Sequence, residues 1–142
     1  MNKRSAQVLR AVVLGAGCAL AAVSVAFAHH SFAMFDLERN LSFQGTVVEY
    51  RWANPHVHVL LRVDPGPNVD PAHVGTWDLE AAGSTVIMAR QGWGRATLKA
   101  GDQISVVVRP LRDGAKGASL FYMVQPDGKR LYTDIARPKE ER

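Results

Sequence analysis

Four of the five histidines in this chain occur as two close pairs, His29-His30 and His56-x-His58. Imidazole nitrogens are good ligands for copper, zinc and iron, and Cu(II) binds most tightly among the first-row divalent ions. Residues two apart on a strand point to the same face, so His56 and His58 can approach one ion. The two pairs therefore predict a transition-metal site, most specifically for copper, with all four histidines as ligands.

The first pair gains a further donor if the chain is cut directly before it. Residues 1–10 carry three basic side chains, an apolar stretch follows over 11–27, and Ala26-Phe27-Ala28 has the small-x-small pattern of a signal-peptide cleavage site. Cleavage after Ala28 leaves His29 with a free α-amine that can close a chelate ring with its own imidazole. Such an amine has an ordinary pKa of about 7.7–8.0 and can release its proton to a metal. We therefore expect a periplasmic or secreted protein that begins at His29.

The single cysteine offers another interpretation of the same segment. Cys18 lies within the apolar stretch, where attachment of a lipid would make the protein a lipoprotein. Gly15 is a poor match for the larger apolar residue usual at that position before a lipidated cysteine, so cleavage after Ala28 is favoured. The mature chain then holds no cysteine and folds without a disulfide of its own.

Residues 29–142 are expected to form one domain after removal of a signal peptide at 1–28. The remaining 114 residues suit one domain with a modest core. The formal charge of +4 falls to +1, because three basic residues and no acidic ones lie in the signal. This near-neutral balance argues against nucleic acid as a partner. No segment of the mature chain approaches the ~20 apolar residues of a membrane span.

Short stretches rich in β-branched and aromatic residues alternate with turn signals along this domain. The expected strands span residues 41–52, 56–64, 74–80, 103–111, 120–125 and 130–135. Gly45 is expected to mark a bulge or bend in the first strand, and Ser84 to cap a short helix over 85–91. A helix between the third and fourth strands is the order of the OB fold. We therefore predict a mainly β protein, a small OB-like barrel of five to six strands, with a sandwich or roll as the alternative.

The second expected strand places the central histidine pair on its polar face. Trp52 precedes this strand and is expected to shield the metal. The strand order can also bring the N-terminus beside the start of this strand. The opposite face holds four apolar residues and is expected to face the core: Val57, Val59, Leu61 and Val63. Three residues elsewhere are expected to play no part in the site, with His73 solvated in a proline-rich loop and Met88 and Met123 filling the core.

Other chemistry has weaker support in the sequence. Asp78 and Glu80 share one face of the third strand, with Trp77 opposite, which is typical of an ordinary two-faced strand. Glu80 is also placed to pair with Arg90. No nucleophile or zinc-protease motif is present, so an enzyme is not expected, although a copper oxidase with a histidine brace stays an option.

An alternative function needs no metal. In it, the barrel is a non-enzymatic module that binds an envelope protein or a small ligand, through the face carrying Tyr50, Trp52 and the histidine pair.

Several motifs together resemble a family of small exported bacterial proteins catalogued as a domain of unknown function. They are His29–Asp36 (HHSFAMFD), Gly45–Val59 (GTVVEYRWANPHVHV), Trp77-x-x-Glu80, Gly92-Trp93 and the Gly101-Asp102 turn. The resemblance implies an exported single-domain β protein and transfers no activity.

In strand order alone, the chain is also similar to periplasmic OB-fold copper chaperones and to bacterial OB-fold stress proteins. Those chaperones use His, Met and a nearby Trp, which Trp52, His56 and His58 match in part. The methionine pair is missing from this strand, which argues against Cu(I) chaperoning.

Overall fold

The computed structural model describes residues 32–125 and 128–133. The chain divides into two units, residues 1–34 and 35–142, and the named strands all lie in the second. In chain order the elements are β1 (Leu41–Arg51), β2 (His58–Val63), the 3-10 turn η1 (Pro71–His73), β3 (Gly75–Ala81), α2 (Thr85–Arg90), β4 (Gln103–Pro110), β5 (Gly117–Val124) and β6 (Arg130–Tyr132).

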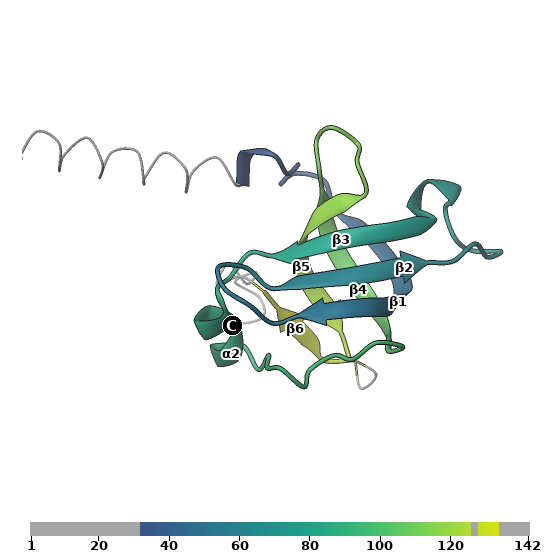
Figure 1. Cartoon of the computed structure of the whole chain (residues 1–142). Helices are drawn as coiled ribbons and strands as arrows, with labels where there is room; N and C mark the ends of the chain where they lie inside the picture. Colours follow the sequence, from purple (N-terminus) through teal and green to yellow (C-terminus); the bar gives the residue numbers. More distant parts are fainter. Residues whose placement is uncertain (1–31, 126–127, 134–142) are drawn as a thin grey trace, which may run out of the picture. The chain divides into compact units, whose positions relative to one another are not determined.

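Five of these strands close into a barrel (Figure 1). β1 is long enough to serve both halves: its first part, from Leu41 to Thr46, pairs with β4, and its second part, from Thr46 to Arg51, pairs with β2. β3 pairs antiparallel with β2 and parallel with β5, which completes the circuit β1-β2-β3-β5-β4. β6 adds to β5 as an extra strand. The predicted OB-like barrel, with α2 between β3 and β4, is confirmed.

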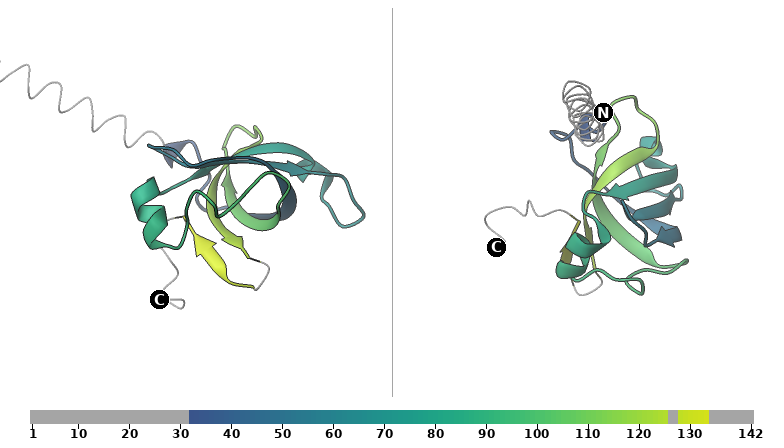
Figure 2. Two further views of the ribbon diagram at one scale, coloured as in Figure 1. Left: turned by 60° about the horizontal axis from the view of Figure 1, so that its bottom comes forward. Right: turned by 60° about the vertical axis from the view of Figure 1, so that its left-hand side comes forward.

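The alternating apolar residues of the strands fill the barrel. Val57, Val59, Leu61 and Val63 are each at most 1% exposed, as their spacing predicted. α2 lies at one end of the barrel and contributes Met88, which is fully buried in the same core (Figure 2). The core also receives Met123 from β5, so both methionines that the sequence assigned to the core are found there.

The strand boundaries differ from the predicted ones by a few residues. β5 begins at Gly117 rather than at residue 120. Its first residues, Gly117 to Leu120, pair in parallel with β3. That pairing joins strands that are far apart in the chain. The local pattern of hydrophobic residues therefore cannot predict it, nor the earlier start of β5.

The irregularity predicted at Gly45 is found three residues later. The register between β1 and β2 shifts between Val47 and Glu49, so Val48 is the bulged residue. Gly45 is needed for a different reason. A Cβ atom there would lie 2.6 Å from the backbone oxygen of Arg62 and 2.8 Å from Cγ of Leu61. The glycine therefore allows β1 to pass close to β2 where the barrel wall bends.

The start of α2 is held by a residue of the β1–β2 loop. Ser84 occupies the N-cap position but makes no side-chain capping bond. The side-chain oxygen of Asn54 instead accepts from the backbone N–H and the hydroxyl of Thr85, at 3.4 and 2.7 Å. The capping interaction predicted for Ser84 is thus made by Asn54, which is distant in sequence. This contact connects α2 to the loop that precedes β2.

We predict that Gly45→Ala destabilises the barrel by about 1–3 kcal/mol, because the added methyl group meets backbone that cannot move away. The midpoint of urea unfolding measures the effect. Gly66→Ala is the matched control, since its Cβ would be 3.4 Å from its nearest neighbour, Cγ2 of Val69. Equal stability of the two variants would contradict this role for Gly45.

Candidate functional site

His56 and His58 lie on the outside of the barrel where β2 begins. Val57, between them, is fully buried, so the two imidazoles share the outer face as the spacing predicted. Each histidine side chain is 27% exposed. His56 precedes the first residue of β2, although the backbone continues in register there, since Ala81 N–H donates to Val57 O at 2.8 Å.

Both histidines are bonded through the same ring nitrogen to groups of β3. Nδ1 of His58 lies 2.8 Å from Oδ1 of Asp78. Nδ1 of His56 lies 3.2 Å from the backbone oxygen of Ala81 and 3.5 Å from Oε1 of Glu80. The ladder places His58 opposite Glu80, with Asp78 two pairs further along and opposite Leu60, so both rings lean in the same direction along the strands.

These partners assign the protons on the rings. A backbone carbonyl only accepts hydrogen bonds, so Nδ1 of His56 must carry the hydrogen in the bond to Ala81. An ionised carboxylate likewise only accepts, so Nδ1 of His58 donates to Asp78. In a neutral imidazole the other nitrogen then holds a lone pair. Both Nε2 atoms are therefore electron-pair donors toward a ligand.

Oε1 of Glu80 lies 3.5 Å from Nδ1 of His56, and the predicted pairing of Glu80 with Arg90 is not found among the described residues. The carboxylate of Asp78 contacts His58 and that of Glu80 contacts His56. The sequence did not predict these contacts. The sequence did indicate that the two histidines and the two carboxylates face outward, because all four occupy the polar positions of two-faced strands. Which strand lies beside which, and in what register, was not available from spacing alone.

The four-histidine metal site can be compared with the structure only in part. His29 and His30 lie outside the described residues. Within the described part of the chain, no three His, Cys, Asp or Glu side chains are grouped so that they could hold a metal ion. His56 and His58 are the two predicted ligands that the structure places together.

Trp52 packs beside α2 at the same end of the barrel. Its ring is 6.2 Å from that of Tyr50, and both pack partly against the core. The hydroxyl of Tyr50 donates to Gly94 O at 2.9 Å, and burial raises the pKa of Tyr50 far above its usual range. Trp52 also lines a shallow depression of about 530 Å³ with four residues of α2: Thr85, Val86, Ala89 and Arg90.

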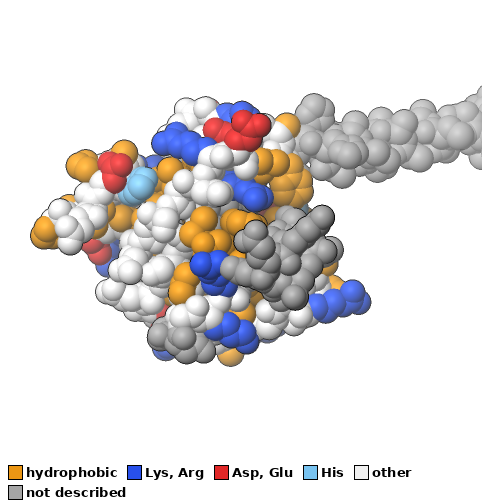
Figure 3. All heavy atoms as spheres, turned by 180° about the vertical axis from the view of Figure 1, so that it is seen from behind, with side chains coloured by type: hydrophobic (Ala, Val, Ile, Leu, Met, Phe, Trp, Pro, Cys, Tyr) orange, Lys and Arg blue, Asp and Glu red, His pale blue; other side chains and the backbone are white. Residues whose placement is uncertain are grey.

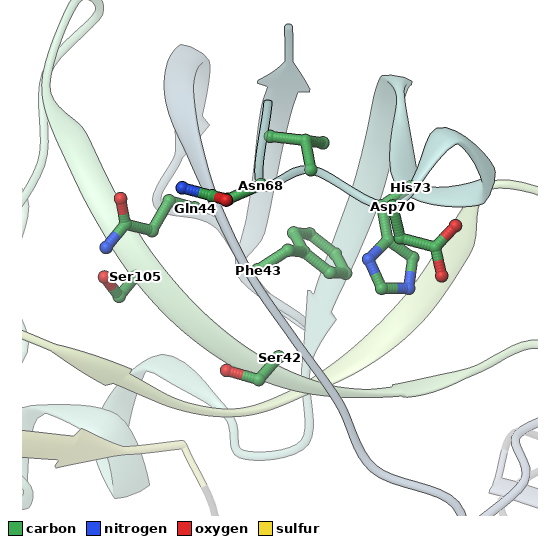
Figure 4. A pocket seen from close by; sticks show the side chains of 8 residues that line it. Ser42, Phe43, Gln44, Asn68, Asp70, His73 and Ser105 are labelled. Atoms are coloured by element: carbon green, nitrogen blue, oxygen red, sulfur yellow. The ribbon is translucent and has the colours of Figure 1, made fainter. Parts of the chain in front are cut away.

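A second hollow, of about 420 Å³, lies at the other end of β2 and was not predicted. It is lined by Ser42, Phe43, Gln44, Asn68, Val69, Asp70, His73 and Ser105 (Figure 4). The prediction that His73 is solvated holds only in part. The residue is half-buried in η1, with its ring centre 5.1 Å from that of Phe43, and its backbone oxygen accepts from Trp77 Nε1 at 2.7 Å.

The face of the molecule seen from behind carries scattered basic side chains. Lys and Arg are spread among apolar and uncharged groups there and do not gather into one patch (Figure 3). Two arginines lie over aromatic rings, Arg109 at 4.2 Å from the centre of Phe121 and Arg130 at 5.0 Å from that of Tyr122. The Lys and Arg side chains visible in this view form no continuous basic groove of the kind that follows a nucleic-acid backbone.

We predict that neutral His58 carries its proton on Nδ1, and that Asp78→Ala moves it toward Nε2, because the variant removes the acceptor. The nitrogen shifts of the neutral ring, measured by long-range proton–nitrogen NMR, report the tautomer. Asp64→Ala, which removes the partner of Arg62 at 3.0 Å, is the control and leaves His58 unchanged. A proton on Nε2 in the unmodified protein would contradict the assignment.

Comparisons with other proteins give the chain a family and no activity. No helix in the described segments is long and apolar enough to span a membrane. Searches of curated proteins and of solved structures returned no match. The model of one protein family matches residues 18–120, most of the barrel included. The resemblance expected from the sequence is thereby confirmed: the chain belongs to DUF6152, a family of unknown function.

Proposed function

We propose that this protein is an exported metal-binding module that takes copper on Nε2 of His56 and His58. The observation that carries the proposal is that both rings are bonded through Nδ1, which leaves the same donor atom free on each. Imidazole nitrogen is a ligand well suited to copper. The proposed site lies on the outer surface of the barrel, where a metal can enter without unfolding the core.

The groups behind the two histidines support a metal more than a solvated surface pair. Metal-bound histidines usually donate their second ring N–H to a carboxylate or a backbone carbonyl, which fixes the ring and makes the ligating nitrogen more basic. Asp78 supplies the carboxylate for His58, and Ala81 supplies the carbonyl for His56. Both acceptors come from β3, so the barrel wall itself orients the rings.

Two imidazoles leave further positions around a copper ion to be filled. Each copper–nitrogen bond is expected to be about 2 Å long, as in zinc sites, so both Nε2 atoms must come within about 4 Å of each other. The sequence provides candidates for the other positions in His30 and in the amine and imidazole of His29, if cleavage follows Ala28. We include these groups in the proposal, together with export to the periplasm.

A second candidate function is a protein-binding module of the cell envelope. The depression beside α2 favours it, because Val86 is 60% exposed there next to Trp52. Exposed apolar surface flanked by an aromatic ring is typical of contact sites between proteins. This function requires no metal, so copper binding separates the two candidates.

We predict that protein exported and processed by a bacterial host binds one equivalent of Cu(II), with nitrogen hyperfine coupling in its EPR spectrum. His56→Ala and His58→Ala each weaken binding by at least tenfold, since each removes one of the ligands (tenfold corresponds to ~1.4 kcal/mol). Asp78→Ala weakens binding by about 10–100-fold, through loss of the group that orients His58.

Two controls locate the site. His73→Ala removes the histidine at the other end of β2 and leaves copper affinity unchanged. A protein with one extra residue before His29 separates the contribution of the terminal amine from that of the strand. Unchanged affinity in both His56→Ala and His58→Ala would refute the proposed site. Absence of stoichiometric binding in the processed protein would leave the envelope partner as the function to pursue.

A further inference from the structure

The hollow at Phe43 exists because β1 extends beyond the end of β2. The β1–β2 ladder stops at the pair formed by Thr46 and Arg62, so the first residues of β1 have β4 on one edge and no strand of the described residues on the other. The loop between β2 and β3 folds back over this position and brings His73 against Phe43. The result is a cavity with an aromatic floor and walls from a strand and a loop (Figure 4).

The polar groups around this floor are mostly uncharged. Gln44 and Ser105 lie on one side of Phe43, Asn68 lies above it, and His73 lies on the opposite side with Asp70 (Figure 4). Primary amides and hydroxyls both donate and accept hydrogen bonds. A ligand that satisfies them needs donors and acceptors arranged around a ring or short chain, as the hydroxyl groups of a sugar are.

The charges near the hollow disfavour an anion. None of the lining residues is Lys or Arg, and Asp70 is a carboxylate. The nearby ammonium of Lys116 is engaged, donating to Ala72 O at 2.9 Å and lying 5.4 Å from the ring centre of Trp77. Oδ1 of Asp70 accepts from the N–H of Ala72 at 2.9 Å, so its carboxylate is held in place by the turn.

We propose that this hollow binds a neutral hydroxylated ring, that is, one or two sugar units. Phe43 and Val69 contact the apolar C–H groups of the ring, while Gln44, Asn68 and Asp70 bond its hydroxyls. The volume of about 420 Å³ lies within the range of small-ligand sites. This site is separate from the proposed copper site and does not depend on it.

The test is an NMR titration of the full processed protein in the presence of a chelator, which keeps copper out of the measurement. The neutral probes are cellobiose and N,N′-diacetylchitobiose, the anionic probe is glucuronate, and the cationic probe is choline. We expect saturable shifts from a neutral probe at residues 42–44, 68–73 and 105. Gln44→Ala combined with Asn68→Ala weakens this binding at least tenfold, because two hydrogen-bonding amides are lost.

Both substituted residues are exposed, so the double variant is expected to fold, and its amide spectrum verifies this. Gln103→Ala is the matched control, an exposed glutamine on β4 outside the lining, and leaves binding unchanged. His58→Ala also leaves it unchanged, which distinguishes failure of this site from failure of the copper site. No response to either neutral sugar, equal binding by the double variant, or saturation at these residues by choline or glucuronate alone would overturn the proposal.

Discussion

β3 is bonded along both edges, antiparallel to β2 and parallel to β5, and this double pairing closes the barrel. The interior of a small closed barrel is filled by side chains, and Trp77, Leu79 and Ala81 of β3 are all buried there. A slip of one residue would turn these side chains outward and bring polar ones into the core. The register between β3 and β2 is therefore fixed by packing. That register decides which carboxylate and which carbonyl each histidine of β2 meets.

The sequence predicted what depends on local alternation. The apolar positions of β2 gave a strand with two outward histidines, and the short helix after the third strand gave the OB-like order. It did not predict the partners of the histidines, because His56 bonds to Ala81, which is 25 residues further along the chain. The parallel pairing of β5 with β3 escaped prediction for the same reason. Contacts of this kind follow from the closure of the sheet, and no short segment contains them.

The environments of His73 and Gly45 depend on strands that are distant from them in the sequence. Proline and glycine around His73 correctly indicated a loop, and a loop usually faces solvent. Here the loop covers part of β1 that extends beyond β2, so His73 packs on Phe43. Gly45 correctly indicated a special position in β1, but the reason is the approach of the Arg62 backbone. In both cases the sequence indicated that the position is unusual. The contact that makes it unusual comes from a neighbouring strand and could not be read from the local sequence.

The two candidate sites lie at opposite ends of β2, and the chemistry of each suits a different ligand. One end presents paired imidazoles backed by acceptors on β3, and the other presents amides and hydroxyls around an aromatic floor. From His58 to Val63 the strand extends about 15–20 Å, at about 3.3 Å per residue. Groups separated by more than about 10 Å with no shared partners usually act independently. A ligand at one end would affect the other only through the rigid barrel wall between them, so each site is to be judged by its own binding data.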